Sequence, residues 1–158
     1  MSNSATKSRT LLALQVTLWT VCAFHVLMGA GLNLSSQFVD TAANLYGAEA
    51  KQWNPQFLYI LRPLGVFMLA LGVFAGAAAI NPSGHRLTIY VFAGIFIIRA
   101  LQRVAFGGQI SELYGIDSSR NVTNMFFFFA LAAVLVVLDQ LSHRGPVGGN
   151  RATTQAAA

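Results

Sequence analysis

The chain has 158 residues, of which 55% are hydrophobic and only 9% are charged. A soluble domain carries about 25% charged residues, so these charges are too few to cover a globular surface in water. The net charge of +5 does not indicate nucleic-acid binding, because the basic residues are scattered over tails, loops and apolar segments instead of forming one patch. Composition and length together indicate one small membrane domain.

Four apolar segments define the organisation of the chain, since a helix needs about 20 mostly apolar residues to cross a bilayer. The segments are residues 11–32, 57–80, 87–106 and 125–141. The first is longer than the roughly 7–15 apolar residues of a signal peptide, and no clear A-x-A site follows it, so we interpret it as a retained helix. We predict an all-α, polytopic membrane protein whose four transmembrane helices form an up-down bundle within residues 11–142.

The segments outside these helices predict the orientation of the chain. Residues 1–10 and 143–158 are expected to be disordered tails. The cluster Asn81–Pro82–Ser83–Gly84 predicts a short turn and an antiparallel hairpin, whereas the longer loops 36–56 and 109–124 are expected to form a compact outer cap. The side of the termini collects five basic residues, which are Lys7, Arg9, Arg86, Arg144 and Arg151. The positive-inside tendency therefore places both termini in the cytoplasm.

Three local patterns concern packing and ancestry. The two longer loops contain similar pentapeptides, LYGAE at 45–49 and LYGID at 113–117, which arise either from duplication of a helical hairpin or by chance. Gly72 and Gly76 form a GxxxG pattern, which favours close helix packing inside one molecule or between two copies. The run Phe126–Phe129 surrounds its helix, so some of its rings must face the interior.

Three arginines inside the apolar segments are the main candidates for a site. They are Arg62, Arg99 and Arg103, and the predicted orientation places all three in the outer half of the membrane. The i,i+4 spacing puts Arg99 and Arg103 on one helix face, with Arg99 about 6 Å deeper. An arginine at the centre of a membrane helix costs roughly 2.5–3.5 kcal/mol, so such residues usually face the protein interior or a wet cavity. The sequence does not show whether Arg99 and Arg103 face inward.

Two interpretations of these arginines remain open. In the structural one, Arg62 and Arg103 extend to the interface and pair with loop carboxylates. The candidate partners are Asp40, Glu49, Glu112 and Asp117. In the functional one, the arginines form a basic pocket that holds an anionic headgroup, a quinone carbonyl or an acidic substrate.

His25 is the other candidate site residue, at a depth comparable to that of Arg99. It is either an interhelical hydrogen-bonding residue or a proton-handling partner of the arginines. His85 and His143 fall on the inner side, so they cannot complete a bis-histidine haem site. The single cysteine, Cys22, excludes an intrachain disulfide. We predict no metal site, and the sequence assigns no cofactor.

Further polar residues in the apolar segments are interpreted as structural. Asp139 lies near the inner end of the fourth segment and is expected to pair with a basic neighbour, namely Arg86, His85 or Arg144. Gln15, Thr17 and Thr20 in the first segment are expected to form interhelical hydrogen bonds, each worth under about 1–2 kcal/mol.

Residues 61–106 resemble the central hairpin of small bacterial DoxX-like four-helix membrane proteins, many of which have unknown function. This stretch reads LRPLGVFMLALGVFAGAAAINPSGHRLTIYVFAGIFIIRALQRVAF, and the matching positions are Arg62, Gly65, Gly72, Arg99 and Arg103. The resemblance implies a membrane subunit or accessory protein, in some cases linked to quinone-dependent thiol or sulfur oxidation. The single cysteine gives thiol chemistry no support.

The leading functional prediction is a non-enzymatic, small integral membrane protein of the inner (plasma) membrane. It is either an accessory or assembly subunit of a membrane complex or a binder of a lipidic or anionic small molecule at Arg62, Arg99, Arg103 and His25. The alternatives are a quinone-linked membrane oxidoreductase subunit and a small oligomeric transporter or channel. The expected partners are the lipid bilayer and a membrane-protein complex or further copies of the chain, and no nucleic acid is expected.

Overall fold

The computed structural model describes residues 2–48 and 53–143, and these residues form six α-helices. The helices are α1 (Ser2–Leu34), α2 (Ser36–Tyr46), α3 (Pro55–Ile80), α4 (Arg86–Ala105), α5 (Gly107–Tyr114) and α6 (Ser118–His143). Four of them, α1, α3, α4 and α6, are long and apolar enough to cross a membrane. The predicted all-α class with four such helices is therefore confirmed, and the chain is a small multi-pass membrane protein.

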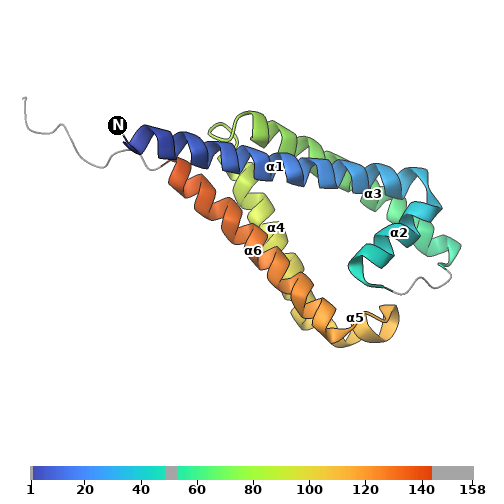
Figure 1. Ribbon diagram of the computed structural model, residues 1–158. Helices are drawn as coiled ribbons and strands as arrows, with labels where there is room; N and C mark the ends of the chain where they lie inside the picture. The colour runs from blue at the N-terminus through green and yellow to red at the C-terminus, as the bar shows by residue number, and fades with distance from the viewer. Residues whose placement is uncertain (1, 49–52, 144–158) are drawn as a thin grey trace, which may run out of the picture.

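The four long helices pair into two arms that together form a V (Figure 1). Helix α3 packs along α1, and α6 packs along α4, while α1 also contacts α6. The arms meet at the narrow end of the V, which holds the α3–α4 turn, the start of α1 and the end of α6 (Figure 1). They diverge toward the wide end, where α2 and α5 lie. Both ends of the described chain thus lie at the same end of the molecule, as four membrane passages require.

The predicted hairpin of the second and third long helices needs a correction. A tight turn does connect α3 to α4, and the backbone N–H of His85 donates to the carbonyl oxygen of Pro82 at 3.3 Å. The two helices nevertheless belong to different arms and diverge from this turn (Figure 1). The reason is that each of them has its main packing face against another helix, α3 against α1 and α4 against α6.

Glycines allow α1 and α3 to approach closely. A Cβ atom at Gly29 would lie 2.6 Å from the carbonyl oxygen of Gly65, and one at Gly72 would lie 2.6 Å from Cγ2 of Val26. Only residues without a side chain permit this separation of two helix backbones. Gly76 also faces α1, so the GxxxG pattern serves packing inside the molecule.

Hydrogen bonds from α1 only partly follow the prediction. The side-chain amide of Gln15 donates to the carbonyl oxygen of Ala79 at 3.2 Å and so links α1 to α3. The hydroxyls of Thr17 and Thr20 instead donate to carbonyl oxygens one turn earlier in α1. Their predicted interhelical role is wrong, because a threonine hydroxyl easily reaches the backbone of its own helix.

A buried carboxylate joins α4 to α6 at the narrow end. Asp139 is 0% exposed, and its Oδ2 accepts hydrogen bonds from Nη2 of Arg86 at 2.9 Å and from the hydroxyl of Tyr90 at 3.0 Å. The predicted pairing of Asp139 with Arg86 is therefore present. The neighbouring apolar core draws residues from both arms, among them Leu14, Leu18, Ala78, Ile89, Phe92 and Leu135.

The start of the chain differs from the prediction. Helix α1 begins at Ser2, whereas the sequence predicts a disordered tail over residues 1–10. Residues 2–10 contain no glycine or proline, and the Thr10 hydroxyl donates to the carbonyl oxygen of Thr6 at 3.0 Å. Once the apolar residues form a helix, adding polar residues to its end is inexpensive, so the helix extends.

The start of the last long helix also differs from the prediction. Helix α6 begins at Ser118 rather than at residue 125. Its first turn is capped by Asp117, whose carboxylate accepts a hydrogen bond from the backbone N–H of Ser119 at 3.0 Å. The predicted tail 143–158 lies outside the described residues except for His143, which ends α6.

Two short helices occupy the loops that are predicted to form a cap. Helices α2 and α5 each end at a left-handed glycine, Gly47 with φ 84° and Gly115 with φ 66°. Each glycine directly follows the Leu-Tyr pair of its pentapeptide, so the shared motif marks a helix C-terminus. Arg120 of α6 donates to the carbonyl oxygen of Leu45 at 3.0 Å and thereby ties α2 to the second arm.

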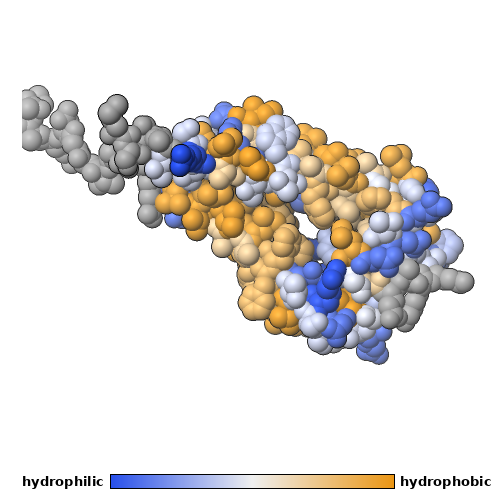
Figure 2. Space-filling model, in the orientation of Figure 1, coloured by the Kyte–Doolittle hydropathy of each residue, from blue (hydrophilic) through white to orange (hydrophobic). Residues whose placement is uncertain are grey.

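The surface of the arms is strongly apolar. Figure 2 shows hydrophobic residues over the long helices and hydrophilic residues gathered toward the ends of the molecule. The exposed apolar side chains include Leu12, Leu27, Phe67, Val73, Leu87 and Phe126. An apolar surface of this extent is expected for helices that contact lipid.

Candidate functional site

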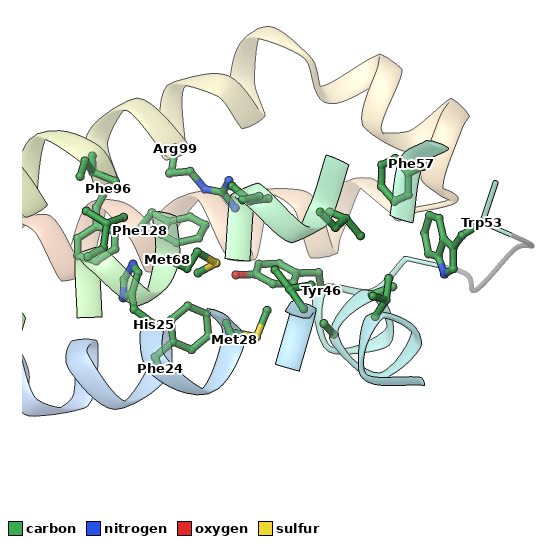
Figure 3. Close-up of a pocket in the computed structure, with 18 residues that line it drawn as sticks. Phe24, His25, Met28, Tyr46, Trp53, Phe57, Met68, Phe96, Arg99 and Phe128 are labelled. Carbon is green, nitrogen blue, oxygen red and sulfur yellow. The ribbon is translucent and has the colours of Figure 1, made fainter. Parts of the chain in front are cut away.

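Two adjoining cavities lie in the wide part of the V. The first has about 300 Å³ and is lined by α1, α2, α3, α4 and α6 (Figure 3). The second has about 580 Å³ and lies mainly between α1 and α6. Five side chains line both, namely Phe24, His25, Tyr46, Phe96 and Phe128. Small-molecule sites typically have volumes of about 300–1,000 Å³, so each cavity is large enough for a ligand.

Arg99 and Arg103 lie on one face of α4, and both guanidinium groups face the ring of Phe128. The guanidinium carbon lies 5.6 Å from the ring centre for Arg99 and 6.0 Å for Arg103. The Arg99 side chain extends into the first cavity (Figure 3). Arg103 is only 9% exposed, and its Nη1 donates to Oδ1 of Asn121 at 2.8 Å. Arg103 therefore faces the protein interior, whereas Arg99 is exposed but lines the first cavity, and the sequence alone could not show either position.

Two of the predicted carboxylate partners have other hydrogen-bond partners. Asp40 accepts a hydrogen bond from the indole N–H of Trp53 at 2.8 Å. Asp117 accepts hydrogen bonds from the hydroxyl and the backbone N–H of Ser119, and these lower the pKa of Asp117 below its ordinary value. The prediction that these loop carboxylates pair with the arginines is wrong for Asp40 and Asp117, because local donors hold both of them.

None of the acidic residues that the structure describes forms an ion pair with Arg99. Glu112 is exposed, and Glu49 lies outside the described residues. Within residues 2–48 and 53–143, both ion pairs involve Asp139 at the narrow end. Arg99 and Arg103 therefore form a pair of like charges that no described carboxylate neutralises.

His25 is buried in the wall shared by the two cavities, with 5% of its surface exposed. Its Nδ1 lies 2.8 Å from the carbonyl oxygen of Val21. A carbonyl oxygen can only accept, so Nδ1 carries the hydrogen and Nε2 of the neutral ring keeps its lone pair. The predicted interhelical hydrogen bond is therefore replaced by one within α1, because Val21 lies one helical turn before His25.

Arg62 is separate from the other predicted site residues. It is exposed on α3 and lines neither cavity. The residues of α3 that line the first cavity are Phe57, Leu61, Leu64, Met68 and Leu71, which recur at helical spacing. The structure thus brings Arg99, Arg103 and His25 together around the aromatic residues of the cavity wall and leaves Arg62 outside.

Three residues complete this region without having been identified as site residues from the sequence. The ring centre of Tyr46 lies 5.9 Å from the guanidinium carbon of Arg103, and Asn121 fixes that arginine. Phe128 is 7% exposed, whereas Phe126 is 62% exposed. The phenylalanine run did indicate that some rings face inward. No sequence signal could place Tyr46, because its position depends on how α2 folds back over the arms.

The site combines a cation, a neutral hydrogen-bond acceptor and apolar walls. Arg99 can donate charge-assisted hydrogen bonds to an anion, and Nε2 of His25 can accept one hydrogen bond. Within the described ranges, no group of three or more His, Cys, Asp or Glu side chains is placed to hold a metal ion. These side chains are suited to non-covalent binding of a molecule that has both polar and apolar parts.

Comparisons with protein-family models, with curated proteins and with solved structures find no match to this chain. The resemblance of residues 61–106 to DoxX-like proteins therefore stays a prediction.

Proposed function

We propose that this protein binds a single-chain amphiphile with an anionic head group, in an inner membrane with both chain termini in the cytoplasm. The head group lies at Arg99, and the apolar chain occupies the space between the arms. One observation carries the proposal. Arg99 extends into a mainly apolar cavity, and no described carboxylate lies within ion-pair distance of it. An anionic ligand would supply the missing counter-charge.

The electrostatics of α4 favour an anion over a neutral head group. Arg99 and Arg103 both face the Phe128 ring, and a cation–π contact contributes about 0.5–2 kcal/mol without removing the charge. Two cations one turn apart repel each other. A carboxylate beside Arg99 would relieve this repulsion and form charge-assisted hydrogen bonds.

The cavity walls favour a flexible chain. Met28 and Met68 line the first cavity (Figure 3), and unbranched methionine side chains adapt to ligands of different shape. The second cavity adjoins the first through shared side chains, so a chain that enters one has space to continue into the other. This proposal selects the small-molecule binder from the functions that the sequence leaves open.

Quenching of tryptophan fluorescence by 9,10-dibromostearate tests the proposal. The chain has two tryptophans, of which Trp53 lines the first cavity and Trp19 is exposed on α1. A Trp19→Phe background therefore reports contact of bromine atoms with Trp53. In detergent micelles we expect saturable quenching, with affinity reduced about ten-fold by Arg99→Gln, since a hydrogen bond to a charged group contributes about 1.5–3 kcal/mol. The uncharged methyl ester should bind about ten-fold more weakly and should not respond to Arg99→Gln.

Arg62→Gln is the matched control, because Arg62 is an exposed membrane arginine that lines neither cavity. It should leave the affinity for dibromostearate unchanged. The proposal is wrong if both arginine variants bind like the parent protein or if both lose affinity equally. Mass spectrometry of molecules that co-purify in mild detergent separates the alternatives, since a quinone or a stoichiometric protein partner would favour the oxidoreductase or accessory-subunit function instead.

A further inference from the structure

We infer that the ligand carries a hydroxyl group within its apolar part and that this hydroxyl donates a hydrogen bond to Nε2 of His25. The inference rests on the proposed binding of an anionic amphiphile and specifies its class as a hydroxylated chain. It follows from the tautomer of His25, from the surroundings of its ring and from its position relative to Arg99.

The backbone of α1 sets the hydrogen-bonding character of His25. Because Nδ1 donates to the carbonyl oxygen of Val21 at 2.8 Å, Nε2 of the neutral imidazole can only accept. A hydroxyl group can donate to it, whereas a ketone or quinone carbonyl cannot. The acceptor therefore discriminates between two ligand groups of similar size and polarity.

No described residue donates a hydrogen bond to Nε2. The neighbouring rings are Phe24, Phe92 and Phe96, with centres 5.5, 5.7 and 6.4 Å from the centre of the imidazole. The side chain is 95% buried from solvent and lines both cavities. Nε2 is not among the fully sequestered atoms that lack a partner, so it is accessible from the cavities. An acceptor in these apolar surroundings gains a hydrogen bond when a ligand brings a donor.

An aromatic path separates His25 from Arg99. The ring centres of His25 and Phe96 are 6.4 Å apart, those of Phe96 and Phe128 are 6.1 Å apart, and Arg99 lies 5.6 Å from Phe128. Figure 3 shows His25 and Arg99 reaching the same cavity from α1 and α4. His25 and Arg99 therefore occupy different points of one cavity wall, and we place the hydroxyl on the chain of a ligand whose anionic head is at Arg99.

A series of matched fatty acids tests the inference. Stearate, 10-hydroxystearate, 12-hydroxystearate and 10-oxostearate compete with dibromostearate for the Trp19→Phe protein in micelles. We expect at least one hydroxystearate to bind about five-fold more tightly than stearate, as one net hydrogen bond allows, and 10-oxostearate to bind no more tightly than stearate. If stearate binds through Arg99 but neither hydroxystearate binds more tightly, the hydroxyl inference is overturned while the proposed function stands. If stearate does not bind, the proposed function itself fails.

His25→Phe supplies an independent readout, because it keeps a ring against Phe92 and Phe96 but removes the acceptor. It should retain stearate binding and abolish the preference for the hydroxylated chain. His85→Phe, which changes an exposed histidine in the α3–α4 turn, should keep that preference. Arg99→Gln should weaken all the carboxylates alike. Persistence of the hydroxyl preference in His25→Phe would overturn the inference, and the ligand series on the parent protein decides the question even if this variant does not fold.

Discussion

Asp139 is a carboxylate that is held completely away from solvent at the narrow end of the V. Its Oδ2 accepts hydrogen bonds from Arg86 and Tyr90, but its Oδ1 has no hydrogen-bond partner among the described residues. Nδ1 of His143 lies 3.3 Å from Oδ1, yet its hydrogen-bond partners are the backbone carbonyl oxygen of Asp139 at 2.8 Å and the hydroxyl of Ser142 at 3.1 Å. A buried carboxylate of this kind is stable only while a cation opposes it.

Arg86→Met should therefore destabilise the protein more than removal of both charges. In the single variant the buried Asp139 carboxylate loses Arg86 and keeps only His143 nearby, whereas Arg86→Met/Asp139→Leu leaves no buried carboxylate. The Arg86 side chain is 44% exposed, so water weakens the effect. We expect a thermal midpoint a few degrees lower for the single variant than for the double variant, measured by circular dichroism in detergent. Equal midpoints would mean that the Asp139 carboxylate does not need Arg86 to stay buried.

Single residues of the site were predictable to different degrees. Arg99 and Arg103 could be recognised because a charge inside an apolar segment is rare, and their common face follows from the i,i+4 spacing. Arg62 carried the same signal and yet lies outside the cavity. Composition cannot separate these cases, because the direction of one arginine depends on which face of its helix packs against a neighbour.

At the scale of elements, glycine packing gives a direct test of the first arm. Gly29→Ala would place its Cβ 2.6 Å from the backbone oxygen of Gly65, which cannot move without separating α1 from α3. We expect a loss of about 1–3 kcal/mol in the free energy of unfolding, as for other overpacked sites, measured by equilibrium unfolding in mixed micelles.

Gly94→Ala on α4 is the control for this prediction. A Cβ at Gly94 meets no atom within 4 Å, so the substitution should be neutral or slightly stabilising. If both alanine variants have the same stability, close α1–α3 packing is not important for the fold.

The elements also show why some helices could be predicted and others could not. The four long helices follow from the length of their apolar segments. Helices α2 and α5 were expected only as an ordered cap, because they are short and their composition is mixed. Their helical conformation depends on local signals at their ends, such as the Ser35 N-cap and the left-handed Gly47 of α2.

The order of elements supports the hypothesis of a duplicated hairpin. Each arm consists of a long helix, a short helix and a second long helix, α1–α2–α3 in one and α4–α5–α6 in the other. The pentapeptide similarity falls at the same place in both, the C-terminus of the short helix. Glycine at such a position is also favoured by its left-handed conformation alone, so the similarity has a local physical cause as well.

At the scale of the whole molecule, the cavities exist because the arms diverge, and this could not be predicted from the sequence. The tight turn after Ile80 favours an antiparallel pair of neighbouring helices, but α3 and α4 separate instead (Figure 1). Each long helix has several apolar faces of similar composition. The sequence therefore does not indicate that α3 packs mainly on α1 and α4 on α6.

A ligand between the arms should stabilise the whole fold. We expect saturating stearate to raise the thermal midpoint of the parent protein, since a ligand at 100 times its Kd adds about 2.7 kcal/mol to the stability of the folded state. The increase should be smaller for Arg99→Gln at the same stearate concentration, and methyl stearate at that concentration should have little effect. An equal increase for the acid and its ester would indicate a general detergent-like effect rather than binding at the cavity.

The two short helices differ in one respect that affects how the molecule can be modified. Helix α2 buries Val39 and Ala42 and forms part of the cavity lining, whereas α5 buries none of its residues. We therefore expect α5 to accept mutations, epitope tags or fluorescent labels at little expense to the interior, whereas the equivalent change in α2 alters the lining of the first cavity. Evolution is under the same constraint. Substitutions in α2 change buried residues and the cavity lining, whereas α5 can change its exposed surface and gain new contacts.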